Sequence, residues 1–332
     1  MWPELSGGEH PPGDLTPVFN RCIKGSDIYT VQSWLLLKRH GVDVHLASDY
    51  VPGAICVAPY DHIAIKDFAF DSYVVAVRDD RPRAYLCDHQ VVETAANATR
   101  PNDHFIPMWS QPTTRPRDPA RGTAIKTLVF KGLTDRNLAP QFRDPLFFGT
   151  LTEMGVEFRP TPPGSDLEQM IDWADFREAD LVLAARNLTR YDASLKPGIK
   201  LINAWRAGVP ALLGPEPSYM SLRRSELDYI EIRSVEDALA AVRHLKANPD
   251  VYRRMIENGF ERAKEFSSER IAQRWYDVLA GPVAEGYERW RRQRRAGFLR
   301  PITYAARAIV HLGARKVYRY RVMHGERILD LA

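Results

Sequence analysis

The stretch 180–215, DLVLAARNLTRYDASLKPGIKLINAWRAGVPALLGP, decides the fold. It opens with a short apolar run at 180–185, which is typical of a buried parallel strand. After a polar loop, residues 196–208 carry Pro near the start and Gly at the end, as expected of a helix of about three turns. Residues 209–213 form a second apolar run. This order predicts a right-handed crossover unit in a parallel sheet.

The loop of this unit and the first turn of its helix are the expected ligand side. In crossover units, ligands bind beyond the carboxyl ends of the strands. Free N–H groups and the helix dipole favour an anion at that place. Arg186, Arg190, Lys196 and Lys200 add positive charge, so the pattern predicts a site for a phosphate or diphosphate.

The neighbouring sequence repeats the alternation of strand and helix. Strands are expected at 126–132 and 156–159, and helices at 139–154 and 166–179, which together predict a parallel sheet. Lys131 lies at the end of the strand at 126–132 and Arg136 follows that strand. Glu216 follows the strand at 209–213, at the same expected edge of the sheet. Each of the three residues has an alternative interpretation as a surface charge or a cap.

The first half of the chain has its own alternating pattern. A helix is expected from residue 26 or 27 to residue 40, followed by strands at 42–47, 54–58, 72–78 and 83–92. Polar residues follow three of these strands. Asp61 and His62 are the best candidates for acid/base work, and His89 is the next, since His titrates near neutrality. The alternative is that they only cap turns.

Two stretches resemble a known family. Residues 200–212, KLINAWRAGVPAL, resemble the donor-site helix and strand of GT-B glycosyltransferases, and residues 235–266, with Asn248 and Pro249, resemble the ending of that family. The likeness covers roughly residues 125–280. It implies an α/β fold of two Rossmann-like domains with a cleft between them, here followed by a C-terminal helical tail. A nucleotide sugar would bind mainly to the second domain.

The sequence lacks one feature of this family, a pair of glutamates, and the resemblance implies one role, diphosphate binding. Retaining members of the family have two glutamates eight positions apart, and here Leu195 and Asn203 occupy those positions. The diphosphate-binding role carries over and the role of the carboxylates does not. The donor and diphosphate candidates are Lys131, Arg136, Arg186, Lys196, Gly198, Lys200, Asn203 and Glu216.

Length and composition predict the domain boundaries. A chain of 332 residues suits two domains. The boundaries are a loose lead-in at 1–16, an acceptor-side domain at 17–112, a linker at 113–124, a nucleotide-sugar-binding domain at 125–280, and a basic amphipathic tail at 281–332.

The tail carries the charge. The chain has a net charge of +4, but residues 287–332 alone carry +9, so the rest carries −5. Residues 299–321 place an apolar stripe on one side of a helix: Leu299, Ile302, Ala306, Ile309, Val310, Val317 and Tyr320. This helix either packs on the first domain or lies on an anionic membrane surface, and the two do not exclude each other.

Absent motifs narrow the chemistry. The sequence has no Asp-x-Asp, no phosphate-binding or dinucleotide glycine motif, and no Cys/His cluster with zinc spacing, so neither a metal nor a cofactor is expected. Three widely spaced cysteines and no leader pattern favour the cytoplasm. No nucleic-acid partner is expected.

The sequence therefore predicts a metal-independent glycosyltransferase that moves a sugar from a nucleotide-sugar donor to a glycan or lipid-linked acceptor. The expected setting is cell-surface polysaccharide synthesis, in the cytoplasm or on the inner face of the membrane. Two alternatives remain: a nucleotide-sugar epimerase-like enzyme on the same fold, and a non-catalytic binding protein that kept the fold.

Overall fold

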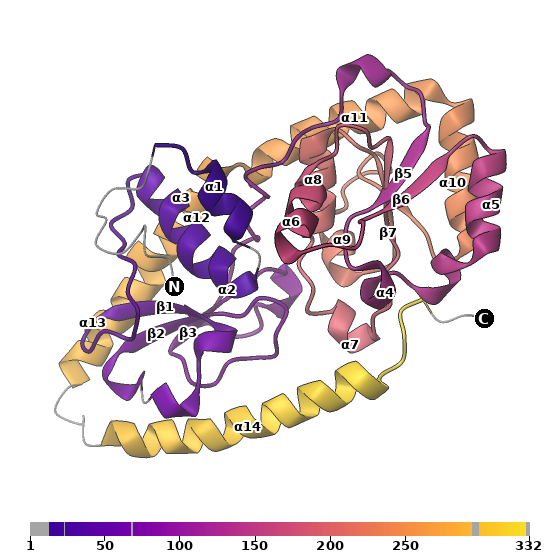
Figure 1. Cartoon of the computed structure of the whole chain (residues 1–332). Helices are drawn as coiled ribbons and strands as arrows, with labels where there is room; N and C mark the ends of the chain where they lie inside the picture. Colours follow the sequence, from indigo (N-terminus) through magenta and orange to yellow (C-terminus); the bar gives the residue numbers. More distant parts are fainter. Residues whose placement is uncertain (1–12, 23, 68, 294–298, 330–332) are drawn as a thin grey trace. The chain divides into compact units, whose positions relative to one another are not determined.

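The computed structural model describes residues 13–22, 24–67, 69–293 and 299–329, and divides the chain into two compact units (Figure 1). Unit 1 combines Met1–Trp109 with Ser268–Tyr320, and unit 2 combines Ser110–Ser267 with Arg321–Ala332. Most of the predicted lead-in, and residues 294–298 and 330–332 of the basic tail, lie outside the described residues.

Unit 1 contains a parallel sheet in the order β1-β2-β3-β4. The strands are β1 (Ile55–Pro59), β2 (Tyr73–Val77), β3 (His89–Val92) and β4 (Asp103–Phe105). All residues of β2 and β3 are buried, and the apolar run of β2 is typical of a strand inside a parallel sheet.

The helices of unit 1 come from both ends of the chain. They are α1 (Thr16–Arg21), α2 (Gly25–Asp27), a π-helical turn (Ile28–Gln32), α3 (Ser33–Arg39), α12 (Ser268–Val278), a second π-helical segment (Leu279–Val283), α13 (Ala284–Arg292) and α14 (Arg300–His324) up to Tyr320. Short 3-10 turns lie at Tyr60–His62, Ile65–Asp67, Ala69–Asp71 and Ala95–Asn97. One buried apolar cluster joins Leu35 of α3, Val75 of β2 and Trp275 of α12.

Two of the strands predicted in this half are wrong or too long. Residues 42–47 form no strand in the described chain: Val42 and Val44 pack on the core while Asp43 and His45 are exposed, so the alternation exists without a partner strand. The predicted strand 83–92 is reduced to its last four residues. The Arg83 guanidinium instead binds the Asp103 carboxylate at 2.6–2.8 Å.

Unit 2 contains a five-stranded parallel sheet in the order β6-β5-β7-β8-β9. The strands are β5 (Thr127–Phe130), β6 (Glu157–Pro160), β7 (Leu181–Ala184), β8 (Ala211–Leu213) and β9 (Ile230–Glu231). β7 and β8 are parallel neighbours with α8 (Ile199–Ala207) between them in sequence, which confirms the predicted crossover unit.

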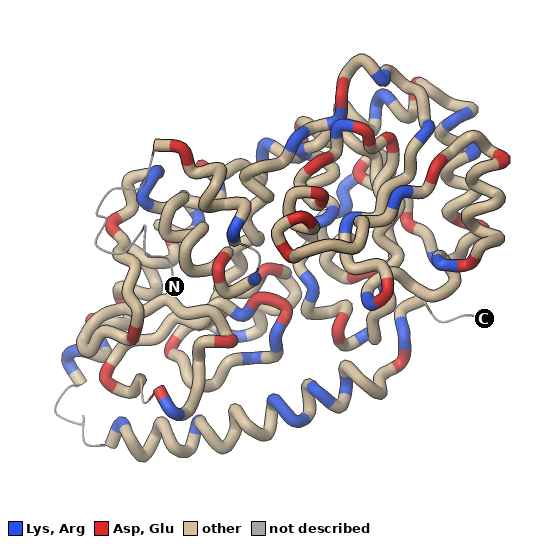
Figure 2. Tube along the Cα trace, viewed as in Figure 1, with Lys and Arg blue, Asp and Glu red and all other residues tan. Residues whose placement is uncertain are grey.

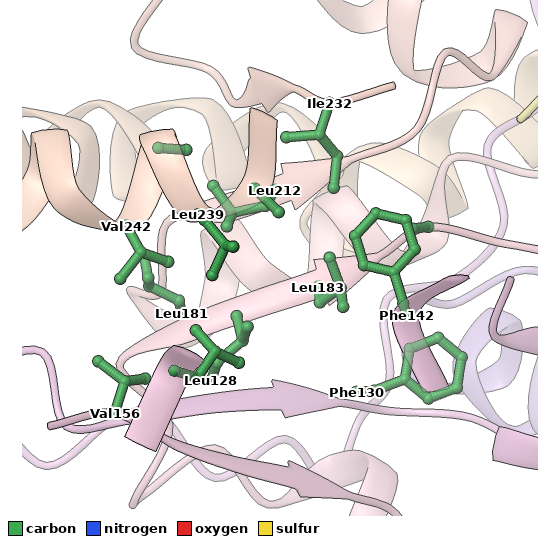
Figure 3. Packing of buried hydrophobic residues seen from close by; sticks show 14 of the residues in the cluster. Leu128, Phe130, Phe142, Val156, Leu181, Leu183, Leu212, Ile232, Leu239 and Val242 are labelled. Carbon is green, nitrogen blue, oxygen red and sulfur yellow. The ribbon is translucent and has the colours of Figure 1, made fainter. Parts of the chain in front are cut away.

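Helices and one apolar cluster complete unit 2. The other helices are α4 (Thr134–Asn137), α5 (Pro145–Glu153), α6 (Asp166–Ala174), α7 (Arg190–Ala193), α9 (Pro217–Leu222), α10 (Val235–Ala247) and α11 (Pro249–Ala263), with 3-10 turns at Pro119–Arg121, Pro140–Arg143 and Lys264–Phe266. Figure 3 shows Leu128, Leu181 and Leu212 from three strands meeting Val242 of α10. Capping boxes at Ser165 and Ser234 begin α6 and α10.

The division into units differs from the boundaries expected from the sequence. α12, expected to finish the second domain, packs instead in the apolar cluster of unit 1 through Ile271 and Trp275. The segment 113–124, expected to be a linker, is tied into unit 2, because Arg117 and Arg121 bind the buried carboxylate of Asp180. Amphipathic periodicity alone does not say which core a helix packs on.

Candidate functional site

Charged groups converge at the carboxyl edge of the sheet of unit 2. Lys131 follows β5, Arg186 lies just after β7, and Glu216 lies just after β8. Lys200 lies in the first turn of α8, which follows the loop after β7. Parallel strands end at the same edge, so four residues that are far apart in the sequence are brought together.

Arg186 and Glu216 form a buried ion pair at this edge. The Arg186 Nε donates to Glu216 Oε1 at 2.7 Å, and its Nη2 donates to the other carboxylate oxygen. The Glu216 side chain is fully buried, and the Tyr219 ring centroid lies 6.0 Å from the guanidinium carbon. Each carboxylate oxygen accepts one bond from Arg186, and the bond from Glu216 to a ribose or sugar hydroxyl stays a prediction. Arg186 brings a charge that Glu216 already neutralises.

Lys200 has a different environment. Its Nζ donates to the carbonyl oxygen of Lys131 and lies 5.6 Å from the Phe130 ring centroid. Burial lowers the pKa of the Lys200 ammonium to about 7, and repulsion from Arg186 adds to this, while Glu216 acts in the opposite direction. No described carboxylate forms an ion pair with Lys200, so its proton is weakly held and an anion would stabilise it.

The other predicted cations are satisfied or peripheral. Lys131 Nζ lies 2.9 Å from Asp172 Oδ1, and Lys196 Nζ lies 3.3 Å from Asp192 Oδ1. Arg136 is exposed on the short helix α4. The sequence placed these charges correctly near one sheet edge, but it could not show that two of them already have acidic partners.

The start of α8 lies at a buried glycine. Gly198 is the N-cap residue, and no side chain caps the first turn. A Cβ at this glycine would lie 2.6 Å from Leu222 Cδ1, so glycine permits close packing of α9 there. Asn203 lies one turn further on, where its Oδ1 accepts a bond from the Gln111 backbone N–H at 3.1 Å. The donor contact through Asn203 stays a prediction, and Gly198 lies at the start of α8, where it was expected.

Two features at this edge escaped the sequence analysis. The Ser218 hydroxyl of α9 is buried without a hydrogen-bond partner among the described residues. The segment after α14 pairs with the loop after β7: Arg190 N–H donates to Glu326 O at 2.7 Å, and Ile328 N–H donates to Leu188 O at 3.0 Å. No local pattern marks either feature, because both depend on contacts between distant residues.

The catalytic candidates lie in unit 1. Asp61 follows β1, and its carboxylate accepts two bonds from Arg81 at 2.9 and 3.1 Å. His62 is exposed in the same 3-10 turn. Both lie at the carboxyl end of a parallel strand, where functional side chains are usually placed.

His89 is less accessible than the sequence suggested. It is buried, its Nδ1 lies 2.8 Å from His104 Nε2, and its Nε2 lies 2.9 Å from the Tyr73 hydroxyl. Burial lowers the pKa of His89 to about 4, with His104 contributing. A Cβ at Gly286 of α13 would lie 2.8 Å from His89 Nε2, so α13 covers the ring. Packing occupies both ring nitrogens, and we do not retain His89 as a catalytic candidate.

No family model matches the chain, and no curated protein matches it. The sucrose-phosphate synthase of Thermosynechococcus elongatus has a TM-score of 0.50 and 12% identity, over 70% of this chain and 74% of that one. The pneumococcal O-GlcNAc transferase GtfA, solved with UDP and GlcNAc, has a TM-score of 0.50 and 12% identity, over 71% and 57%.

These neighbours are GT-B glycosyltransferases. The chain has the GT-B fold. The glycosyltransferase TarM also matches, with a TM-score of 0.48 and 12% identity, over 68% of this chain and 54% of TarM. The chain thus spans a little more than half the length of TarM and of GtfA. The predicted fold class, with parallel sheets and a C-terminal helix, is confirmed.

Proposed function

We propose that this chain is a glycosyltransferase that takes a sugar from a nucleotide-sugar donor and binds the donor's diphosphate at the edge of β5, β7 and β8. The observation that carries the proposal is the half-buried Lys200 ammonium, which has no acidic partner among the described residues and lies in the uncapped first turn of α8. The GT-B fold supports it, and so does GtfA, which was solved with UDP and GlcNAc.

The proposed chemistry needs no divalent metal. When the bond between sugar and diphosphate breaks, negative charge builds up on the diphosphate oxygens. Lys200 and the free amides at the start of α8 stabilise that charge from fixed positions, the kind of effect that usually makes the largest contribution to catalysis. Glu216 neutralises and orients Arg186, so Lys200 supplies the uncompensated positive charge at this edge. The buried Ser218 hydroxyl is available to donate to the donor.

The acceptor side of the proposal rests on Asp61 and His62. Asp61 and His62 are both exposed, but Arg81 binds the Asp61 carboxylate, and we propose that His62 takes the proton from the acceptor hydroxyl. The proposed acceptor is a glycan or a lipid-linked saccharide of cell-surface polysaccharide synthesis, at the cytoplasmic face of a membrane. The pairing of Asp61 with Arg81 makes Asp61 the positioning member.

Calorimetric titration with UDP tests the donor site. Lys200→Ala is expected to weaken UDP binding about 10- to 100-fold, because charge-assisted bonds to phosphate contribute about 1.5–3 kcal/mol. His62→Ala is the matched control, and it should leave UDP affinity unchanged while transfer to an acceptor falls. Equal UDP affinity for wild type and Lys200→Ala would overturn the proposal.

The products separate the transferase from its alternatives. A transferase releases nucleoside diphosphate only as sugar reaches an acceptor, whereas an epimerase-like enzyme changes the donor without one. A binding protein does neither. At the positions of the family's glutamate pair, Leu195 is buried and Asn203 binds the backbone of Gln111, so no carboxylate stands there for a step that needs one.

Proton uptake on binding is a second test of Lys200. Since the pKa of Lys200 is about 7, the group is mostly neutral at pH 8, and a bound diphosphate raises its pKa. UDP binding at pH 8 is therefore expected to take up protons, at most about 0.9 per site, and affinity should fall as pH rises above about 7. Titrations in buffers of different ionisation enthalpy measure this uptake.

Lys200→Arg provides the control, because an arginine stays charged throughout this range and should bind without proton uptake. A wild-type binding enthalpy that is the same in every buffer would contradict the expected role of Lys200.

A further inference from the structure

α14 has one face that packs on unit 1. Tyr304 donates its hydroxyl to the carbonyl oxygen of Ala64 at 3.2 Å, and Ala308 and His311 are buried. The His311 ring centroid lies 5.3 Å from that of Tyr60. Positions 304, 308, 311, 315 and 318 follow the 3.6-residue repeat of one helix face. This face of α14 is therefore fully used within unit 1.

A second stripe begins two residues earlier and lies on the opposite side. Two residues correspond to roughly 200° around a helix. Ile302, Ile309 and Tyr320 are 64%, 74% and 68% exposed, and Val310 and Val317 are about half exposed. These are the side chains that the sequence analysis placed on one stripe. The structure leaves that stripe uncovered, since α14 packs on unit 1 through the other face.

The charge of α14 is of one sign. Residues 300–324 contain five Arg and one Lys, and no Asp or Glu. Along this helix Figure 2 shows positions of Lys and Arg and none of Asp or Glu. Lys316 and Arg319 lie at the edge of the apolar stripe by their helical spacing, whereas Arg307 is paired with Asp88 of unit 1, so two basic groups border the exposed apolar face.

We propose that this outward face of α14 binds the surface of a bilayer that contains anionic phospholipid. Apolar side chains enter the region between headgroups and acyl chains, and the bordering basic groups bind lipid phosphates. Among the described residues, no helix meets the length and apolarity needed to cross a membrane. α14 is 25 residues long and lies in the plane of the surface.

Charge complementarity selects this partner over a second copy of the chain. A symmetric dimer through this face would bring together two helices whose charged residues are all basic, and these like charges would repel. An anionic bilayer offers an apolar interior and a negative surface at once. The inference uses no residue of the donor site, so its test and the UDP titration can fail independently.

Vesicle co-sedimentation of the full chain tests this inference. Wild type is expected to pellet with phosphatidylcholine vesicles that contain phosphatidylglycerol, and much less with pure phosphatidylcholine or at high salt. Ile302→Ser/Ile309→Ser/Val317→Ser should lower the apparent affinity at least about tenfold. Lys316→Gln/Arg319→Gln should lose the preference for anionic vesicles.

Leu146→Ser is the matched control, because Leu146 is 77% exposed on α5 of unit 2 and should be neutral for vesicle binding. All of these side chains are exposed, so the variants should keep the wild-type unfolding midpoint. Equal pelleting of wild type and the triple variant would overturn the inference. So would a wild-type dimer in sedimentation velocity that the triple variant abolishes, if neither binds vesicles.

Discussion

Arg186→Met is expected to destabilise unit 2 by about 3–5 kcal/mol, because it leaves the Glu216 carboxylate buried without a counter-ion. The Glu216 side chain has no exposed surface and the Arg186 side chain is 11% exposed, so water cannot replace the lost partner. Urea unfolding followed by circular dichroism measures the change. Arg177→Met is the control: its pair with Asp175 is exposed, and such pairs contribute about 0–1 kcal/mol.

The double variant Arg186→Met/Glu216→Leu separates the cost of an orphaned charge from the value of the pair. Replacing both partners by apolar residues is often close to neutral, so most of the lost stability should return. UDP affinity should change little in the double variant, since the pair that it removes has no net charge and Lys200 stays in place. If the double variant is as unstable as Arg186→Met, the burial of Glu216 is not the cause.

The central part of the fold could be predicted because its signals are local. β7 and β8 are short runs in which every residue is buried, and Gly208, with φ of 68°, ends α8 at the predicted residue. The strand expected at 42–47 shows the limit of such signals. Alternating apolar residues form a strand only if a partner strand is available, and the partner is not encoded in the segment itself.

The sequence located the candidate site at one sheet edge, but it did not show which of the charged residues there already have partners. Strand ends and a helix start located Lys131, Arg186 and Lys200 at one edge. Their partners are distant: Glu216 is 30 residues from Arg186, and Asp172 is 41 residues from Lys131. A single sequence does not show which charges pair over such separations. It therefore presented several equal cations, whereas the structure singles out Lys200.

The C-terminal helix α14 shows the same limit of what a sequence pattern can predict. Its periodicity defined one apolar stripe but not whether that stripe faces the protein, because the period of an α-helix does not say which side of the helix is covered. Tyr304 and His311 settle the question through contacts with residues more than two hundred positions away. The more apolar stripe lies outward, which is the reverse of the usual order in a globular protein and the reason for the lipid-binding proposal.

Asp180→Asn is expected to cost about 3–5 kcal/mol, since it removes a buried charge whose partners stay behind. The Asp180 carboxylate is fully buried at the start of β7 and accepts bonds from Arg117 at 2.8 Å, from Arg121, and from the Lys126 and Thr127 N–H groups at 2.8 and 3.0 Å. Asp250→Asn is the control, because Asp250 is 83% exposed in its pair with Arg253 and should change stability by less than about 1 kcal/mol.

The stability of the protein at low pH should depend on the same carboxylate, that of Asp180. Burial raises the pKa of Asp180, but bonds from Arg121, Lys126 and Arg117 together outweigh burial and hold its pKa below the ordinary value. The unfolded chain therefore binds this proton first as pH falls, so the stability from Asp180 is full above about pH 5 and is lost as pH falls through the folded pKa. Urea midpoints measured from pH 7 downward should drop less steeply for Asp180→Asn than for wild type. Parallel curves for the two proteins would show that Asp180 does not hold the segment 113–124 through its charge.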